Sequence, residues 1–146
     1  MLQVSKFQAV PENNVALKIS LKAFEKIILG GAVIKNGPHP SIFFIENNVL
    51  VLRERDIMTE EQADTPCKRI YFTVQLMYMD EKNLAHYHAI YWRQMGELTD
   101  TVKTMLAFSI ETGEHILASE YYKALKVAKK MIAYEKELLD HAKQRV

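Results

Sequence analysis

Several residue types are scarce in this chain of 146 residues. It contains one cysteine, Cys67, together with five glycines and four prolines. A single cysteine excludes an internal disulfide and a cysteine-rich zinc site. The longest apolar run, Ile27–Ile34, is far shorter than the about 20 residues that span a membrane. The first ten residues also lack the apolar core of a secretory signal. We therefore expect a cytoplasmic protein without a membrane segment.

Strong net charge and catalytic motifs are also missing. The net charge is +1, which is far from the strongly basic balance of many nucleic-acid-binding domains. The chain has no G-x-S-x-G, no glycine-rich phosphate loop and no H-x-x-x-H pair. A helix N-terminus lowers the pKa of a thiol, but the sequence supplies no base beside Cys67. These absences predict a protein that is not an enzyme and that has neither a metal nor a cofactor.

The residues that are present indicate a globular protein with two different halves. Hydrophobic residues make up 49% and charged residues 25% of the chain, as in ordinary globular domains. Three of the four prolines and three of the five glycines lie in the first 40 residues. This asymmetry predicts an α+β fold, with a small, mostly antiparallel β-sheet over 15–58 and a helical bundle over 59–146. We expect 15–146 to form one compact domain and 1–14 to be a flexible tail.

Alternation and turn residues define the predicted strands. Hydrophobic and polar residues alternate in the first of them, which predicts a half-buried strand. Gly30 and Gly31 predict a bulge or sharp bend within the second. The third is an unbroken apolar run, consistent with a strand covered on both faces, and Asn47-Asn48 predicts a tight hairpin into the fourth. The four predicted strands are Val15–Leu21, Lys26–Lys35, Ile42–Ile45 and Val49–Arg53.

Two signals mark the change to helix. Thr59 and Gln62 fit a capping box, and Thr65-Pro66 fits an N-cap followed by proline at the first helical position. The helix that follows is apolar nearly all round, which is typical of the central helix of a bundle or of an oligomer contact. Further helices are predicted over Asn83 to about Met105, over Glu111–Ala118, and from Ser119 as N-cap to about His141.

A long segment resembles the signature of the FlbT family of flagellum-biogenesis regulators. The segment is Val51–Asp80, and the shorter pieces Leu17–Lys22, Gly31–Gly37 and Tyr121–Leu125 agree with it. The resemblance covers roughly Ala16 to Glu137. It implies a post-transcriptional regulator that binds the 5′ untranslated region of flagellin mRNA and represses its translation or promotes its degradation. It also implies FlaF, a companion flagellar protein, as a participant in the same circuit.

The resemblance defines no residue-level RNA site, so the candidates come from the residues themselves. If the fourth strand continues, Arg53 and Arg55 project from one of its faces and present two planar guanidinium groups to phosphates and bases. Pairing with neighbouring carboxylates is the equally weighted alternative. Lys123, Lys126 and Lys130 form one basic stripe, which could follow a phosphate backbone or simply be a solvated helix face. The candidate RNA-binding residues are Arg53, Arg55, Lys68, Arg69, Lys123, Lys126 and Lys130.

A second hypothesis is a protein-interaction adaptor or chaperone for flagellin or FlaF that affects mRNA only indirectly. The near-neutral charge and the aromatic residues of the central helices favour it, although most such aromatics belong to a core. The candidate protein-interaction residues are Tyr71, Phe72, Tyr78 and Trp92. Open sheet edges predict a homo-oligomer under either hypothesis, and neither a membrane nor DNA is an expected partner.

Overall fold

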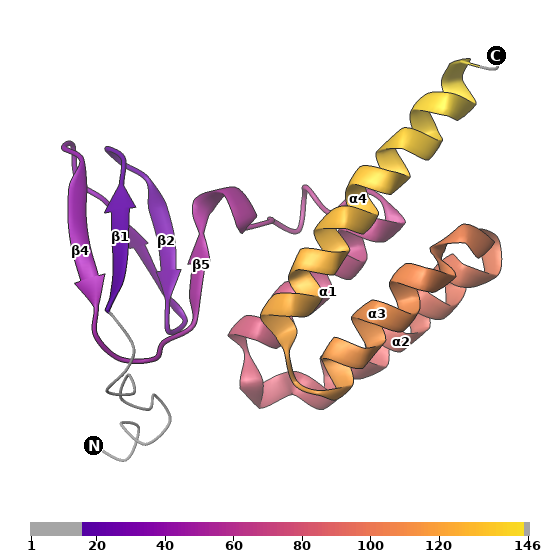
Figure 1. Cartoon of the computed structure of the whole chain (residues 1–146), viewed down its shortest axis with the longest axis horizontal. Helices are drawn as coiled ribbons and strands as arrows, with labels where there is room; N and C mark the ends of the chain where they lie inside the picture. Colours follow the sequence, from indigo (N-terminus) through magenta and orange to yellow (C-terminus); the bar gives the residue numbers. More distant parts are fainter. Residues whose placement is uncertain (1–15, 145–146) are drawn as a thin grey trace. The chain divides into compact units, whose positions relative to one another are not determined.

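The computed structural model describes residues 16–144, which contain strands in the first part and helices in the second (Figure 1). This order confirms the predicted α+β class. The chain divides into two compact units, with the boundary between Ile57 and Met58. We call them the strand unit and the helical unit. The predicted tail, 1–14, lies outside the described residues.

The strand unit contains two small antiparallel sheets. In the first sheet, β1 (Leu17–Leu21) pairs with β4 (Ser41–Ile45). In the second, β2 (Lys26–Leu29) lies between β3 (Ala32–Lys35) and β5 (Val51–Arg53). Ile19, Leu21 and Ile27 form the buried centre of a hydrophobic cluster that receives side chains from both sheets. The unit is therefore held together by a small core between the two sheets.

The predicted second strand is two strands. Gly30 and Gly31 have positive φ angles of 56° and 87° and form the tight turn between β2 and β3. A two-residue hairpin turn of this kind needs positive φ at both central positions, which glycine adopts without strain. The expectation of one strand with a bend at this position is wrong for that reason.

Two expectations about β4 are also wrong. Ile42 and Phe44 are 61% and 60% exposed, because alternate side chains of β4 point away from the core and nothing in the described part of the strand unit covers that face. Asn47-Asn48 does not form a hairpin, since β4 pairs with β1 and β5 pairs with β2. The first error comes from reading an unbroken apolar run as buried on both faces, and the second from treating strand neighbours in sequence as neighbours in the sheet.

The helical unit contains α1 (Pro66–Met79), α2 (Leu84–Thr101), α3 (Leu106–Leu117) and α4 (Tyr121–Gln144). In it, α1 packs against both α2 and α4, and α3 packs against α4 (Figure 1). Ile70, Val74 and Met77 of α1 are fully buried, which agrees with the predicted central position of this helix. None of the helices within residues 16–144 is long and apolar enough to cross a membrane.

The predicted helix signals differ in outcome. Thr65 caps α1 by accepting a hydrogen bond from Lys68 N at 3.2 Å, as expected. Thr59 and Gln62 exchange the two bonds of a capping box, but only a turn follows them. Ser119, the predicted N-cap of α4, has φ 59° and instead ends α3. There Ser119 N donates to the carbonyl of Ile116 and Glu120 N to that of His115, the two bonds of a Schellman motif.

Candidate nucleic-acid interface

A groove of about 630 Å³ opens in the strand unit beside the turn that follows β1. We call it the strand groove. It is lined by three basic residues, Lys22, Arg53 and Arg55, and by two acidic ones, Glu25 and Glu54. Two of the predicted RNA-binding residues therefore meet in one place. Every residue of the groove comes from the strand unit.

Arg53, the last residue of β5, forms part of the groove wall. Its Nη2 atom donates a hydrogen bond of 2.6 Å to the backbone carbonyl of Ser20 in β1. The same atom lies 4.0 Å from a carboxylate oxygen of Glu25. Because β1 and β5 belong to different sheets, this bond links the two sheets. Arg53 is half-buried and positioned by the fold.

Arg55 is the accessible guanidinium of the groove. The strand ends at Arg53 and a 3₁₀ turn covers Glu54–Asp56, so the expectation that the two arginines share one strand face is wrong. The Arg55 side chain is 76% exposed. Its Nε atom lies 3.8 Å from Asp56 Oδ2, too far for a hydrogen bond. The guanidinium can therefore bind a phosphate or stack on a base.

The two carboxylates hold the backbone of the groove. Glu25 Oε1 accepts a hydrogen bond of 2.8 Å from the amide of Lys22. Glu54 Oε1 accepts one of 3.1 Å from the amide of Lys26. Their charges offset much of the positive charge of the groove. The affinity of the groove for an anion therefore depends on direct contacts with the exposed cations more than on the summed charge of the groove.

Phe24 is a component that the sequence reasoning missed. It stands in the turn after β1 with φ 61°, a left-handed conformation that is uncommon for a residue other than glycine. Its side chain is 57% exposed, and Lys35 Nζ lies 5.6 Å from the ring centroid. The signal in the sequence was an aromatic residue within a short turn between two strands. An exposed ring on a fixed turn is a surface on which an unpaired base can stack.

The basic stripe of Lys123, Lys126 and Lys130 lies exposed on α4. Lys123 forms an ion pair with Glu120. Lys123 Nζ lies 2.9 Å from Glu120 Oε2. This hydrogen bond lowers the pKa of Glu120, and a hydrogen bond with His115 lowers it further by a smaller amount. Lys126 Nζ lies 5.0 Å from the centroid of the Tyr122 ring. Lys130 is exposed on the same helix. The stripe can supply phosphate contacts separately from the strand groove.

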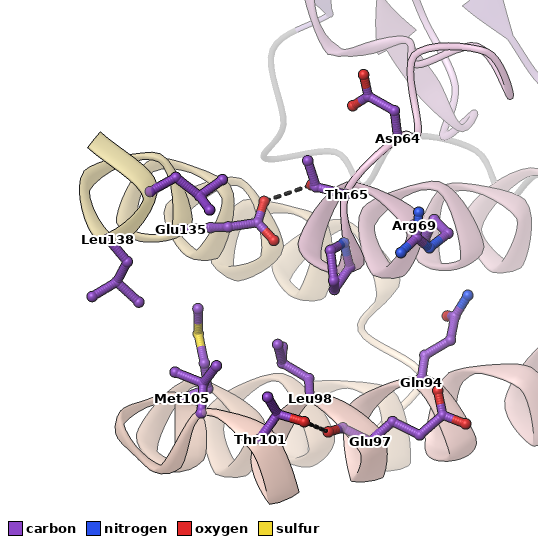
Figure 2. Close-up of a pocket in the computed structure, with 13 residues that line it drawn as sticks. Asp64, Thr65, Arg69, Gln94, Glu97, Leu98, Thr101, Met105, Glu135 and Leu138 are labelled. Atoms are coloured by element: carbon purple, nitrogen blue, oxygen red, sulfur yellow. Dashed lines mark hydrogen bonds between the residues drawn. The ribbon is translucent and has the colours of Figure 1, made fainter. Parts of the chain in front are cut away.

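Lys68 and Arg69 belong to the helical unit and not to the strand groove. Lys68 Nζ lies 3.3 Å from Asp64 Oδ1. Arg69 is exposed and lines a second groove, of about 560 Å³, between the ends of α1, α2 and α4 (Figure 2). We call this second groove the helical groove. Its walls are largely apolar.

A buried carboxylate closes one side of the helical groove. Glu135 of α4 accepts a hydrogen bond of 2.5 Å from Thr65 Oγ1 (Figure 2) and one of 3.0 Å from Cys67 N. It therefore caps the N-terminus of α1 from another helix. Burial, assisted by the negative charge of Glu135, raises the pKa of Cys67 to about 12. The suggestion that a helix N-terminus lowers this pKa is wrong, because burial and the carboxylate outweigh the helix.

The four predicted protein-interaction aromatics differ in their exposure. Tyr71 is buried and therefore unavailable to a partner, and Phe72 and Tyr78 are half-buried. Trp92 is 42% exposed, and its ring lies against Gly113 of α3. One helical face of α3 carries exposed apolar side chains on both sides of Gly113. We call Trp92, Leu106, Ile110 and Leu117 the α3 surface.

Comparisons with known proteins agree with one another. A family model described as "Flagellar protein FlbT" matches residues 17–139. The flagellum biosynthesis repressor protein FlbT of Caulobacter vibrioides is 40% identical over 127 residues, covering 86% of this chain and 90% of that protein. A probable flagellum biosynthesis repressor protein FlbT of Rhodopseudomonas palustris is 39% identical over 123 residues, covering 84% and 97%. No solved structure matches the chain.

Proposed function

The chain belongs to the FlbT family of flagellar proteins, and from that premise we propose that it regulates flagellum biogenesis after transcription. It binds the 5′ untranslated region of flagellin mRNA and represses translation or promotes degradation of that mRNA. Curated relatives are named flagellum biosynthesis repressors, which supports a regulatory, non-catalytic role. Those names do not mention RNA, and RNA binding is the mechanism that we propose for the repression.

One observation carries the RNA proposal, namely the pairing of Phe24 and Arg55 at the strand groove. An exposed ring in a fixed turn and an exposed guanidinium line the same groove. Proteins recognise single-stranded RNA by stacking bases on aromatic rings and by bonding phosphates and base edges with arginine. The strand groove contains both elements within one small, hydrogen-bonded frame.

The remaining residues have supporting roles in this proposal. Arg53 holds the groove wall through Ser20, and Glu25 and Glu54 hold its backbone. Lys123, Lys126 and Lys130 add phosphate contacts from α4. The surface pair of Lys123 with Glu120 opposes such a contact only weakly, since exposed ion pairs contribute at most about 1 kcal/mol. Because only a few phosphates are contacted, we expect moderate affinity that weakens with salt.

The test is a titration of labelled flagellin leader RNA with the full chain at about 50 mM and about 200 mM salt. We expect Phe24→Ala and Arg55→Ala each to lower the affinity by about tenfold, as loss of one stacked base or one charged contact does. Phe44→Ala and Arg93→Ala are the matched controls, since both residues are exposed and neither lines the strand groove. Binding that is absent at both salt concentrations, or equally affected by the controls, would contradict the proposal.

The α3 surface favours a second candidate function. Four large apolar side chains are exposed there, and such patches commonly mark protein interaction sites. In this alternative the protein is an adaptor or chaperone for flagellin or FlaF and reaches mRNA only through them. Co-purification and light scattering of Leu117→Ser against the unchanged chain would test it. A monomer that binds neither protein would remove this alternative and the expected homo-oligomer together.

A further inference from the structure

We infer that the helical groove binds an amphipathic α-helix of a partner protein, with an acidic flank facing Arg69 and a basic flank facing Glu97. This inference goes beyond RNA binding and does not depend on it, because the groove lies in the helical unit and its floor is apolar. It also concerns a different surface from the α3 surface. The helical spacing of the α4 wall, the volume of the groove and the charges at its rim support this assignment.

One wall of the groove has the spacing of a helix-packing face. It belongs to α4, where Leu138 and Leu139 follow Glu135 by one turn. Ridges with intervals of three and four form grooves that accept the side chains of another helix. The opposite side is lined by Leu98 of α2 and, beyond the end of that helix at the extended residue Val102, by Met105 of the 3₁₀ turn. The α4 wall therefore suits one more helix of a bundle.

The groove is large enough for the anchors of such a helix. Its volume of about 560 Å³ lies inside the range of about 300–1,000 Å³ found for binding pockets. Leu98 and Met105 form a buried floor, whereas Leu139 stands half-exposed at the rim. A helix laid in a groove inserts apolar anchors at i, i+3 or i+4, and i+7. Such anchors would cover the rim leucine, which water now reaches.

The charges at the rim set the chemistry of the occupant. Asp64 is paired with Lys68, and Glu135 is satisfied by Thr65 and Cys67. Within residues 16–144, Arg69 and Glu97 make no ion pair with each other or with another side chain. Figure 2 shows Arg69 on the α1 side and Glu97 on the α2 side of the groove. A helix lying between them meets one unpaired positive side chain on one flank and one unpaired negative side chain on the other.

This arrangement distinguishes a helix from other ligands. RNA needs several cations, and among the described residues Arg69 is the only basic one that lines the groove. An amphiphile whose head group carries one charge would leave one of the two opposed charges unmatched. Complementary charges on the two flanks of a partner chiefly select the partner and its orientation. The groove therefore favours a helix with one acidic and one basic flank.

The test uses synthetic helical peptides with one leucine stripe and three flank patterns: lysine with glutamate, lysine on both flanks, and glutamate on both flanks. Binding to the full chain is measured by fluorescence anisotropy. We expect the mixed peptide to bind about fivefold more tightly than the other two. Arg69→Glu should shift the preference to the all-lysine peptide, and Glu97→Lys should shift it to the all-glutamate peptide. This design does not depend on the direction in which the peptide lies.

Controls separate the groove from other apolar surfaces. A peptide of the same composition with scattered leucines should not bind. Leu139→Ser should lower the affinity for the mixed peptide severalfold, whereas Leu117→Ser on the α3 surface should leave that affinity unchanged. The fold of both variants is checked by circular dichroism.

Three outcomes would overturn the inference or reassign a residue. An equal loss of affinity in the two variants, or a peptide preference that does not change in Arg69→Glu and Glu97→Lys, would overturn the inference. Filling of the groove by octyl glucoside while every helical peptide fails to bind would also overturn it. Loss of leader-RNA affinity in Arg69→Glu without a change in peptide preference would assign Arg69 to RNA instead.

Discussion

The strand unit and the helical unit present their exposed side chains in different ways. In the strand unit the groove is built from turn residues, with Phe24 and Arg55 projecting from short connections around β1 and β5. In the helical unit the groove lies between packed helices, and aliphatic side chains from α2, from the turn after it and from α4 line it. Turns place single polar or aromatic groups, whereas packed helices produce apolar ridges. The two proposals accordingly assign different kinds of partner to these two grooves.

Buried polar groups show the same contrast. In the helical unit, Glu135 and the thiol of Cys67 lie inside the packed helices, next to the start of α1. In the strand unit, Glu25 and Glu54 bond backbone amides at the surface. Disturbing the helical interior should therefore affect folding, and disturbing the strand groove should affect binding. The following predictions test this separation.

The largest effect is expected for the reactivity of Cys67. Because the pKa of its buried thiol is about 12, compared with the ordinary 9.0, the native protein holds very little thiolate at pH 8 to 9. We expect alkylation by iodoacetamide to be at least about a hundredfold slower in the native chain than in urea. The raised pKa also means that this group stabilises the fold fully below about pH 9 and that its contribution falls as the pH rises toward 12. Rapid alkylation of native protein would show that the interior opens.

A large loss of stability is expected for Glu135→Ala. The change removes the acceptor of Thr65 Oγ1 and Cys67 N and leaves a buried amide unsatisfied, so we expect a loss of about 2–3 kcal/mol. Trp92, the only tryptophan in the chain, reports unfolding of the helical unit by its fluorescence in urea. Glu137→Ala, an exposed change on the same helix, should have little effect. An unchanged midpoint would mean that α1 needs no cap from α4.

Replacing Phe24 by glycine should raise the stability of the strand unit and lower the affinity for leader RNA. Phe24→Gly removes the left-handed strain at φ 61°, so we expect the strand unit to gain about 1 kcal/mol. Phe24→Ala keeps the strain and should bring no such gain. Both variants lack the ring, and both should lose affinity for leader RNA equally. Hydrogen exchange of the strand amides and the RNA titration measure the two effects. Retained RNA binding in both variants would remove Phe24 from the site.

The smallest effect is expected for Gly113→Ala. A Cβ at this position would lie 3.2 Å from Cη2 of Trp92, so the ring must move slightly. The gain in helix propensity should offset this contact, leaving the stability within about 0.5 kcal/mol, while the Trp92 emission shifts. Gly96→Ala in α2 meets no atom within 4 Å and should show the full gain of about 1 kcal/mol. Equal gains in both variants would mean that Trp92 does not rest on α3.

At the start of α1, local signals predicted local structure well, although the capping box at Thr59 and the N-cap predicted at Ser119 did not start a helix. Thr65-Pro66 indicated the start of α1, and the apolar positions of α1 indicated its central place, because a cap and a helical face involve residues within a few positions of each other. Strand pairing was predicted poorly. The partners of β4 and β5 are β1 and β2, which lie twenty or more residues earlier in the chain. Nothing in the third and fourth strands themselves specifies those partners.

The sequence by itself determined the family, the change from strands to helices and the residues that carry charge. Only the tertiary structure decided which of these residues share a site. It separated Arg55 from the strand face of Arg53, placed Phe24 beside both, and brought Glu135 to the start of α1 from about seventy positions away. The physical reason is that hydrogen bonds within a turn or helix are encoded by neighbouring residues, whereas grooves and buried caps form only where distant segments pack.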